Sequence, residues 1–212
     1  MAAHYLSLHV NTLKIWVCGR SYGSPKKFTP PIIILPDRSQ NLLSFTNLIE
    51  AHVLSAIRRV HGVSMTKIKT AVQFLSEEMK SEHPLADMNL HTDGVDLFVE
   101  QIDKIVNVSK DGQIAIKQVI CAYISRIDRS EEGLIIRLYP FTTSSNIDFK
   151  EPRRIVIDPH VSFGRPVLVG TGIPVEILSA RFKSGESLHA LALDYDCDLT
   201  QIESAIRYEM AA

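Results

Sequence analysis

The sequence predicts a mainly helical α+β chain, and three observations support this fold class. Residues 2–16 have the pattern of two short helices joined by a tight turn. Apolar residues recur every three or four positions at 44–60 and 64–79, which predicts two amphipathic helices. Short strands punctuated by glycine and proline follow residue 150, and three helices come after them. We expect an N-terminal winged helix-turn-helix, a small mixed α/β middle region and a C-terminal three-helix, helix-turn-helix-like domain with a short β-hairpin.

These three parts are expected at residues 1–80, 81–150 and 151–212, and they differ in charge. The chain of 212 residues has a formal net charge of −1, but its first part holds ten Lys and Arg against four Asp and Glu. Carboxylates are in excess in the other two parts. Because phosphate binding needs local positive potential, we expect any contact with nucleic acid in the first part.

The second short helix is the predicted recognition element. It is expected to begin near His9 or Val10, after a turn at residues 6–9, and to share a small apolar core with the first helix. Asn11 then lies in its first turn, where an amide can pair with adenine. Thr12 can contact an oxygen of the DNA backbone, and Lys14 can contact guanine or phosphate. The alternative is a plain helical hairpin with solvated side chains.

A basic segment that resembles a wing follows this helix. Arg20, Lys26 and Lys27 lie in a turn-rich stretch and are the candidate phosphate contacts. A short apolar strand is expected at 30–36, bounded by prolines.

The middle region is expected to alternate strands and a helix. Alternating apolar residues predict strands over 94–108, and a helix is expected at 113–127 before a strand at 133–139. The acids of the first stretch allow a metal-dependent nuclease as an alternative function, but four acids in a polar stretch are more often surface. They are Asp93, Asp96, Glu100 and Asp103.

The C-terminal part is predicted to contain three helices. Pro174 can open a helix at 175–183, Ser187 can cap a second to about residue 195, and Thr200 with Glu203 forms a capping-box pattern for a third. The last two helices have a helix-turn-helix pattern, but aspartates flank them. Because such a surface repels phosphate, we expect dimerisation or protein binding there.

Composition excludes several other classes. The chain is 45% hydrophobic, and no apolar stretch is long enough for a membrane span. Its three cysteines lie far apart, so we expect reduced thiols and a cytoplasmic protein. No nucleophile elbow, phosphate loop or metal-ligand spacing is present, and we expect no catalytic residue, metal or cofactor.

Two segments resemble known families. Residues 2–16, with Gly62 to Lys69 as a later helical segment, resemble the MerR-like winged helix-turn-helix group, although His9 stands where that group has a Ser-type cap. Residues 153–210 resemble the domain of unknown function 433. The similarity lies in Ile157-Asp158-Pro159, Gly164-Arg165-Pro166-Val167, Gly170-Thr171-Gly172-Ile173-Pro174-Val175 and Ile202-x-x-Ala205-Ile206. Gly172 replaces the usual Arg.

Together the two segments resemble VapB-type antitoxins. The resemblance implies a dimeric transcriptional autoregulator that binds operator DNA and neutralises a PIN-like ribonuclease toxin. A free-standing MerR-like regulator that senses a small ligand is the alternative.

Overall fold

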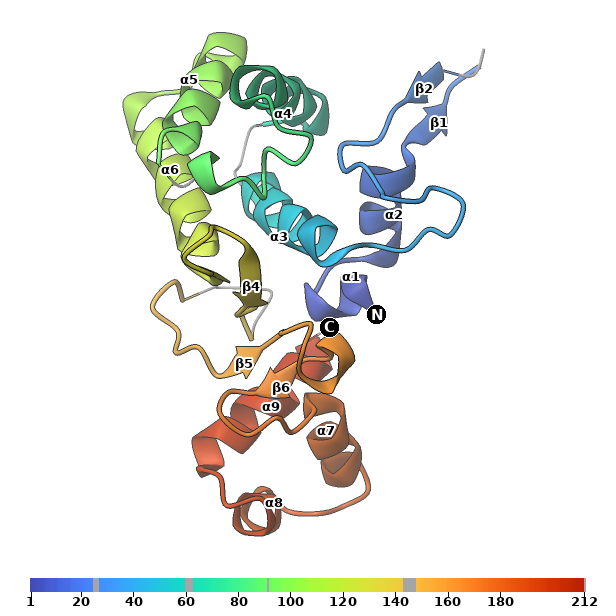
Figure 1. The fold of residues 1–212 in the computed structure, drawn as a ribbon, viewed down its shortest axis with the longest axis vertical. Coiled ribbons are helices and arrows are strands. Elements are labelled where there is room, and N and C mark those ends of the chain that lie inside the picture. The colour runs from blue at the N-terminus through green and yellow to red at the C-terminus, as the bar shows by residue number, and fades with distance from the viewer. Residues whose placement is uncertain (25–26, 60–62, 91, 143–147, 212) are drawn as a thin grey trace. The chain divides into compact units, whose positions relative to one another are not determined.

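The computed structural model describes a mainly helical α+β chain, which confirms the fold class at this level (Figure 1). Within the described residues there are nine α-helices and three two-stranded antiparallel sheets. Contacts group the chain into two compact units, Met1–Leu8 with Arg126–Ala212 and His9–Ser125. The expected division into three parts stays a prediction. The described ranges are 1–24, 27–59, 63–90, 92–142 and 148–211.

The unit of residues 9–125 is built around helices. Its elements are α2 (Val10–Cys18), β1 (Arg20–Tyr22), β2 (Lys27–Thr29), α3 (Phe45–Arg59), α4 (Met65–Met79), the 3₁₀ turn η1 (Met88–Leu90), α5 (Gly94–Val106) and α6 (Lys110–Ile124). Every residue of α3 from Asn47 to Ile57 is buried. Helix α3 packs on α6, and α5 packs on both α4 and α6, so the four helices pack as one group in which α3 is buried over most of its length.

The strand expected at 94–108 is wrong, because most of this segment forms helix α5. Its buried residues include Val95, Phe98, Val99 and Ile102, which recur at steps of three and four. Some apolar residues of this segment also fit the two-residue alternation of a strand. Helices α4 and α6 pack on α5, and this packing favours the helical period over the strand period.

The strand expected at 30–36 is also wrong. The hairpin that follows α2 is formed instead by β1 and β2, in which Arg20 pairs with Thr29 and Tyr22 with Lys27. Pro30 and Pro31 have no N–H to donate to a ladder. The next two amides donate instead to one helix carbonyl, that of Trp16, at 2.8 and 3.0 Å.

The other unit combines the N-terminus with residues 126–211. Its elements are α1 (Ala2–Tyr5), β3 (Ile127–Arg129), β4 (Ile135–Leu138), β5 (Ile155–Val156), the short turn η2 (Ser162–Gly164), β6 (Val167–Leu168), α7 (Val175–Lys183), α8 (Leu188–Asp194) and α9 (Leu199–Ala211). Strands β3 and β4 pair, β5 pairs with β6, and Leu138 bridges to Ile157. Helix α7 packs on α9, which also contacts α8.

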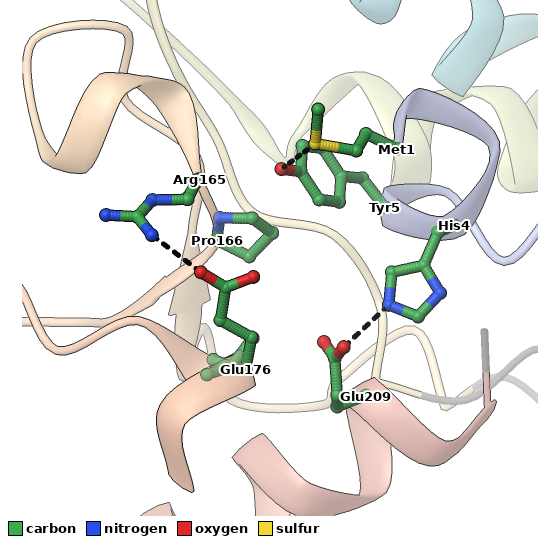
Figure 2. A pocket seen from close by; sticks show the side chains of 8 residues that line it. Met1, His4, Tyr5, Arg165, Pro166, Glu176 and Glu209 are labelled. Atoms are coloured by element: carbon green, nitrogen blue, oxygen red, sulfur yellow. Dashed lines mark hydrogen bonds and ion pairs between the residues drawn. The ribbon is translucent and has the colours of Figure 1, made fainter. Parts of the chain in front are cut away.

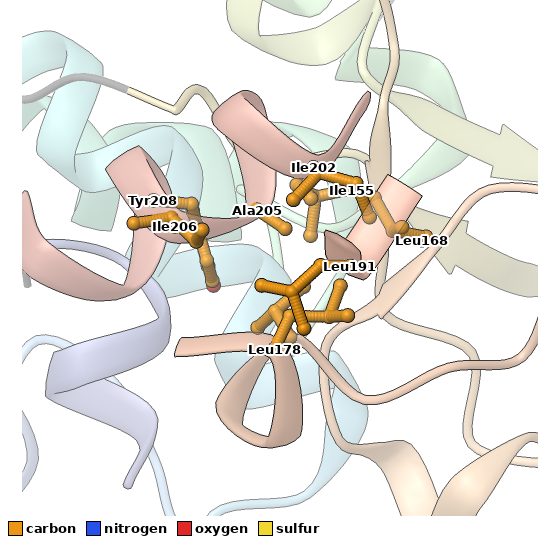
Figure 3. Close-up of a cluster of buried hydrophobic side chains, with 9 residues drawn as sticks. Ile155, Leu168, Leu178, Leu191, Ile202, Ala205, Ile206 and Tyr208 are labelled. Atoms are coloured by element: carbon orange, nitrogen blue, oxygen red, sulfur yellow. The ribbon is translucent and has the colours of Figure 1, made fainter. Parts of the chain in front are cut away.

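One apolar cluster holds the C-terminal helices together (Figure 3). Leu178 of α7, Leu191 of α8 and Ile202 of α9 are fully buried in it. Tyr208 is buried as well, and its hydroxyl donates to the carbonyl oxygen of Tyr5 at 2.7 Å. Helix α1 is thereby attached to α9, more than two hundred residues away in the chain.

The first residues of the C-terminal helices agree with the sequence-based prediction, except for the N-terminal cap of α9. The Ser187 hydroxyl accepts from the Ala190 N–H at 3.1 Å, as a capping serine does. Thr200, by contrast, lies inside α9, so the predicted capping box is wrong. The Asp198 N–H instead donates to the side chain of Gln201 at 3.0 Å, which satisfies an amide just before the helix.

Candidate nucleic-acid interface

Helix α2 presents two of the predicted contact residues to solvent. Asn11 and Lys14 are exposed, three residues apart on one face, while Leu13 and Trp16 are buried on the other. The imidazole of His9 accepts from the Asn11 N–H at 3.2 Å, so His9 caps the helix as a serine would. The exposed amide and ammonium groups are therefore accessible to a ligand on the outer face.

Thr12 has a structural partner that the sequence did not reveal. Its hydroxyl accepts a hydrogen bond from Nη1 of Arg58 at 2.8 Å, which ties α2 to the C-terminal end of α3. Arg58 is exposed and adds a further cation beside α2. In the sequence, the only indication of this contact is the basic pair Arg58-Arg59 near the end of the predicted 44–60 helix.

The β1–β2 hairpin directly follows α2 and carries the remaining described cations. Strand alternation places Arg20, Tyr22 and Lys27 on one face, and all three are exposed. Within the described residues, no ion pair involves Arg20 or Lys27, so both can meet an anion. Lys26 lies outside the described residues.

Gly19 fixes the angle at which the hairpin leaves α2. It has a φ of +77°, and a Cβ built there would lie 2.5 Å from the Thr29 carbonyl oxygen and 2.8 Å from the Phe28 ring. Only glycine allows this close approach without rearrangement. On the far side, Nζ of Lys69 donates to the carbonyl oxygen of Pro30 at 2.8 Å and anchors the chain where β2 ends.

The hairpin also exposes two aromatic rings. Tyr22 is 50% exposed and Phe28 is 61% exposed, on opposite faces of the two strands. Together, α2 and the hairpin offer amide, cationic and aromatic groups within one unit. This arrangement can contact bases from the helix and phosphates from the hairpin.

The apolar core predicted between the first two helices stays a prediction, because the two helices belong to different compact units. Helix α1 belongs to the unit that contains residues 126–212, and α2 belongs to the other. The winged helix-turn-helix therefore stays a prediction.

The C-terminal helices carry an ion-pair network centred on Arg181. Arg181 of α7 donates from Nε to Glu186 at 2.7 Å and also pairs with Asp194 of α8. The hydrogen bonds from Arg181 lower the pKa of Glu186. Asp196 and Asp198 stay exposed beyond α8. This surface is poorly suited to a phosphate backbone.

A small hollow in this unit is lined by two ion pairs together with apolar and aromatic side chains (Figure 2). Arg165 pairs with Glu176 at 2.6 Å, and Nε2 of His4 lies 2.9 Å from Glu209. Tyr5 lines the same hollow, and burial raises the pKa of its hydroxyl. Because the charged groups already satisfy one another, the hollow offers no free group that selects a ligand.

The acids considered for a nuclease do not form a metal centre. Asp96 binds Lys117 at 2.6 Å, Glu100 binds Lys104 at 2.9 Å, and Asp103 accepts from the Val108 N–H. Across the described ranges, no three His, Cys, Asp or Glu side chains come together as metal ligands would. In the same ranges, no helix has the length and apolarity needed to cross a membrane.

Comparisons with known proteins extend these observations. Residues 155–208 match the family model described as "Protein of unknown function (DUF433)". The chain is 29% identical to "Putative antitoxin VapB45" of Mycobacterium tuberculosis, over 97% of this chain and 90% of that protein. It is 27% identical to "Uncharacterized protein Rv2308" of the same organism, over 96% and 85%. The crystal structure of Rv2018 from M. tuberculosis has a TM-score of 0.69 at 23% identity, covering 97% and 94%.

The C-terminal resemblance is thus confirmed, because the matched range lies inside the expected 153–210. The chain is distantly homologous, over 97% of its residues, to the protein named "Putative antitoxin VapB45". The likeness to Rv2018 supports the fold of the whole chain. The MerR-like resemblance and the DNA-contact residues stay predictions.

Proposed function

We propose that this chain is the antitoxin of a type II toxin–antitoxin pair, a cytoplasmic protein that binds operator DNA and neutralises a PIN-like ribonuclease. The observation that carries the proposal is the full-length homology to the protein named "Putative antitoxin VapB45". An antitoxin acts by binding, so we expect no catalytic residue and no cofactor. The separation of charge between the two units supports a division of labour between DNA and protein partners.

The DNA contact is proposed for α2 and the hairpin. Asn11 and Lys14 contact base edges or phosphates from the helix, with Thr12 beside them at the Arg58 contact. Arg20 and Lys27 hold phosphates, as does Lys26. A homodimer places two copies of this surface on a near-palindrome with half-sites about 34–36 Å apart, one helical turn of DNA.

The toxin contact is proposed for the unit with the DUF433 match. A ribonuclease binds RNA, so its cleft needs positive potential. Residues 155–208 carry seven carboxylates against four Lys and Arg side chains. Electrostatic complementarity therefore favours this unit as the partner of such a cleft.

A gel shift on the DNA upstream of the gene tests the first contact. Replacing Lys14 and Lys27 by alanine is expected to lower affinity and to reduce the slope of log K against log salt by about 0.9 for each phosphate that the variant no longer neutralises. Lys110→Ala is the matched control, because Lys110 is an exposed lysine on α6. An unchanged affinity and salt slope in the double variant contradicts the assignment.

Co-expression with the product of the neighbouring gene tests the second contact. We expect that product to be a PIN-like ribonuclease that copurifies with this chain, and the chain to suppress its RNA cleavage. A neighbouring product that neither binds the chain nor cleaves RNA contradicts the proposal.

A further inference from the structure

Phe163, in the unit that contains residues 126–212, is unusual because almost all of its side chain faces solvent. It is 97% exposed, more than any other large hydrophobic side chain in the described part of the chain. Burying an aromatic ring releases a large apolar area, so a fixed and fully solvated ring has much to gain from a partner.

The backbone that presents this ring is held in an unfavourable conformation. Ser162, Phe163 and Gly164 have φ values of +48°, +58° and +72°, three successive residues in the left-handed region. Residues with a Cβ rarely adopt this conformation, and bulky ones least of all. Such strain concentrates where it serves a function, so this loop is a candidate for one.

Hydrogen bonds clamp the strained loop on both sides. The Gly164 N–H donates to the Val161 carbonyl at 3.0 Å, and Nε of Arg165 donates to the Ser162 carbonyl at 3.1 Å. The Ser162 hydroxyl donates to the carbonyl of Gly172 at 3.2 Å. The ring is therefore presented by a fixed backbone, which lowers the conformational entropy lost on binding.

The loop is hydrogen-bonded to a turn in which two glycines have open space around them. A Cβ at Gly170 would meet no atom within 4 Å, and one at Gly172 would meet only Val161, at 3.9 Å. Through the Ser162–Gly172 bond, the loop that carries Phe163 is held beside this turn. The open space at the two glycines leaves room for a partner to approach the protruding ring.

We infer that Phe163 is the anchor by which this chain docks its toxin, with the ring inserted into an apolar pocket of the ribonuclease. The inference rests on the proposed function and adds to it the residue and the type of contact. Aromatic anchors that fill pockets dominate the energetics of many protein interfaces. The loop lies within the DUF433 match, in the unit for which a toxin contact is proposed.

Other occupants fit this surface less well. Nucleic acid could stack on the ring, but stacking sites lie in basic grooves, and two of the four cations in residues 155–208 are held in ion pairs. In a symmetric dimer the same surface must also supply the pocket. The hollow found in this unit has apolar side chains in its lining but is flanked by two ion pairs, and a ring that entered it would desolvate those charges.

Phe163→Gly in the full-length chain separates binding from folding. Glycine accepts the left-handed backbone, so the thermal midpoint is expected to equal or exceed that of the unchanged chain. The affinity for the inactivated ribonuclease encoded beside the gene is expected to fall at least about thirtyfold, as for an interface hot spot. Leu134→Ser is the matched control, because Leu134 is 63% exposed in the same unit but outside the DUF433 match, and it should bind normally.

Each other outcome overturns the inference. If the unchanged chain binds the ribonuclease and Phe163→Gly binds it equally well, the anchor is wrong and the proposed function stands. If the glycine variant instead loses only self-association in sedimentation, the loop is a dimer contact. If the unchanged chain does not bind the ribonuclease, the proposed function and the inference both fail.

Discussion

In the unit of residues 9–125, the cations of α2 and the hairpin face solvent, whereas in the other unit Arg165 and Arg181 are held by carboxylates. Lys14, Arg20 and Lys27 have no ion-pair partner within the described residues. Arg165 and Arg181, in contrast, pair with acids on α7, α8 and the loop between them. A count of charges does not show this difference. A cation already committed to a carboxylate does not neutralise a phosphate, so the two surfaces suit different partners.

Truncation of the C-terminal core should produce the largest change and should affect one unit first. Leu178→Ala removes a fully buried side chain and is expected to cost about 2–5 kcal/mol. Trp16 is the only tryptophan and lies in the other unit. In urea, the circular-dichroism transition should therefore move to lower concentration while the Trp16 fluorescence transition keeps its midpoint. Leu54→Ala, in α3, should reverse the pattern. A joint shift for either variant would show that the units unfold together.

The second prediction compares two glycines with positive φ. Gly170→Ala meets no atom and should cost about 1–2 kcal/mol for the backbone alone. Gly19→Ala should cost more, because its Cβ would collide with the Thr29 carbonyl. It should also weaken DNA binding by turning the hairpin away from α2. Melting curves give the comparison, with Trp16 fluorescence for the unit of residues 9–125 and circular dichroism for both units. Equal costs would contradict the role assigned to Gly19.

Acid should affect the two units in opposite directions. Burial would raise the pKa of Asp158, but the His160 N–H and Arg137 outweigh it, so the pKa lies below 3.8. The stability that this carboxylate contributes is present above pH 3.8 and is lost as pH falls through its folded pKa. Burial raises the pKa of Glu50 above 4.5, despite bonds from Asn47 and His83. Its contribution is present below pH 4.5 and is lost as pH rises through the raised pKa.

Urea midpoints between about pH 3 and 6 check these directions. Relative to Glu50→Gln, the unchanged chain should lose stability with rising pH in the Trp16 transition. Relative to Asp158→Asn, it should lose stability with falling pH in the other transition. If the urea midpoints of a variant and of the unchanged chain change with pH in parallel, that carboxylate does not contribute to the pH dependence of stability.

The smallest effect is expected at the acids of α5. Glu100→Gln breaks an exposed pair with Lys104, and both side chains are 62% exposed. Such pairs contribute less than about 0.5 kcal/mol, so the thermal midpoint should barely change. Mg²⁺ or Mn²⁺ should not raise the midpoint either. A clear metal-dependent rise would favour the nuclease alternative.

Local patterns predicted many helices of this chain closely. Apolar spacing placed the helices observed at Phe45–Arg59 and Met65–Met79, and Pro174 marked the start of α7. The pattern failed over 94–108, where apolar residues fit two periods and the neighbouring helices decided the outcome. It failed again at Pro30, because the next amides found a helix carbonyl that no local pattern reveals.

The candidate surfaces divide in the same way. The basic character of the first residues and the acidic character of the C-terminal part follow from composition, since charge depends only on which residues are present. The Thr12–Arg58 bond, the attachment of α1 to α9 and the exposure of Phe163 depended on the folded chain. Each requires residues that are distant in sequence to meet, or a backbone conformation that only neighbouring groups hold in place. Tertiary packing therefore determined which charges stay free and which aromatic ring remains in solvent.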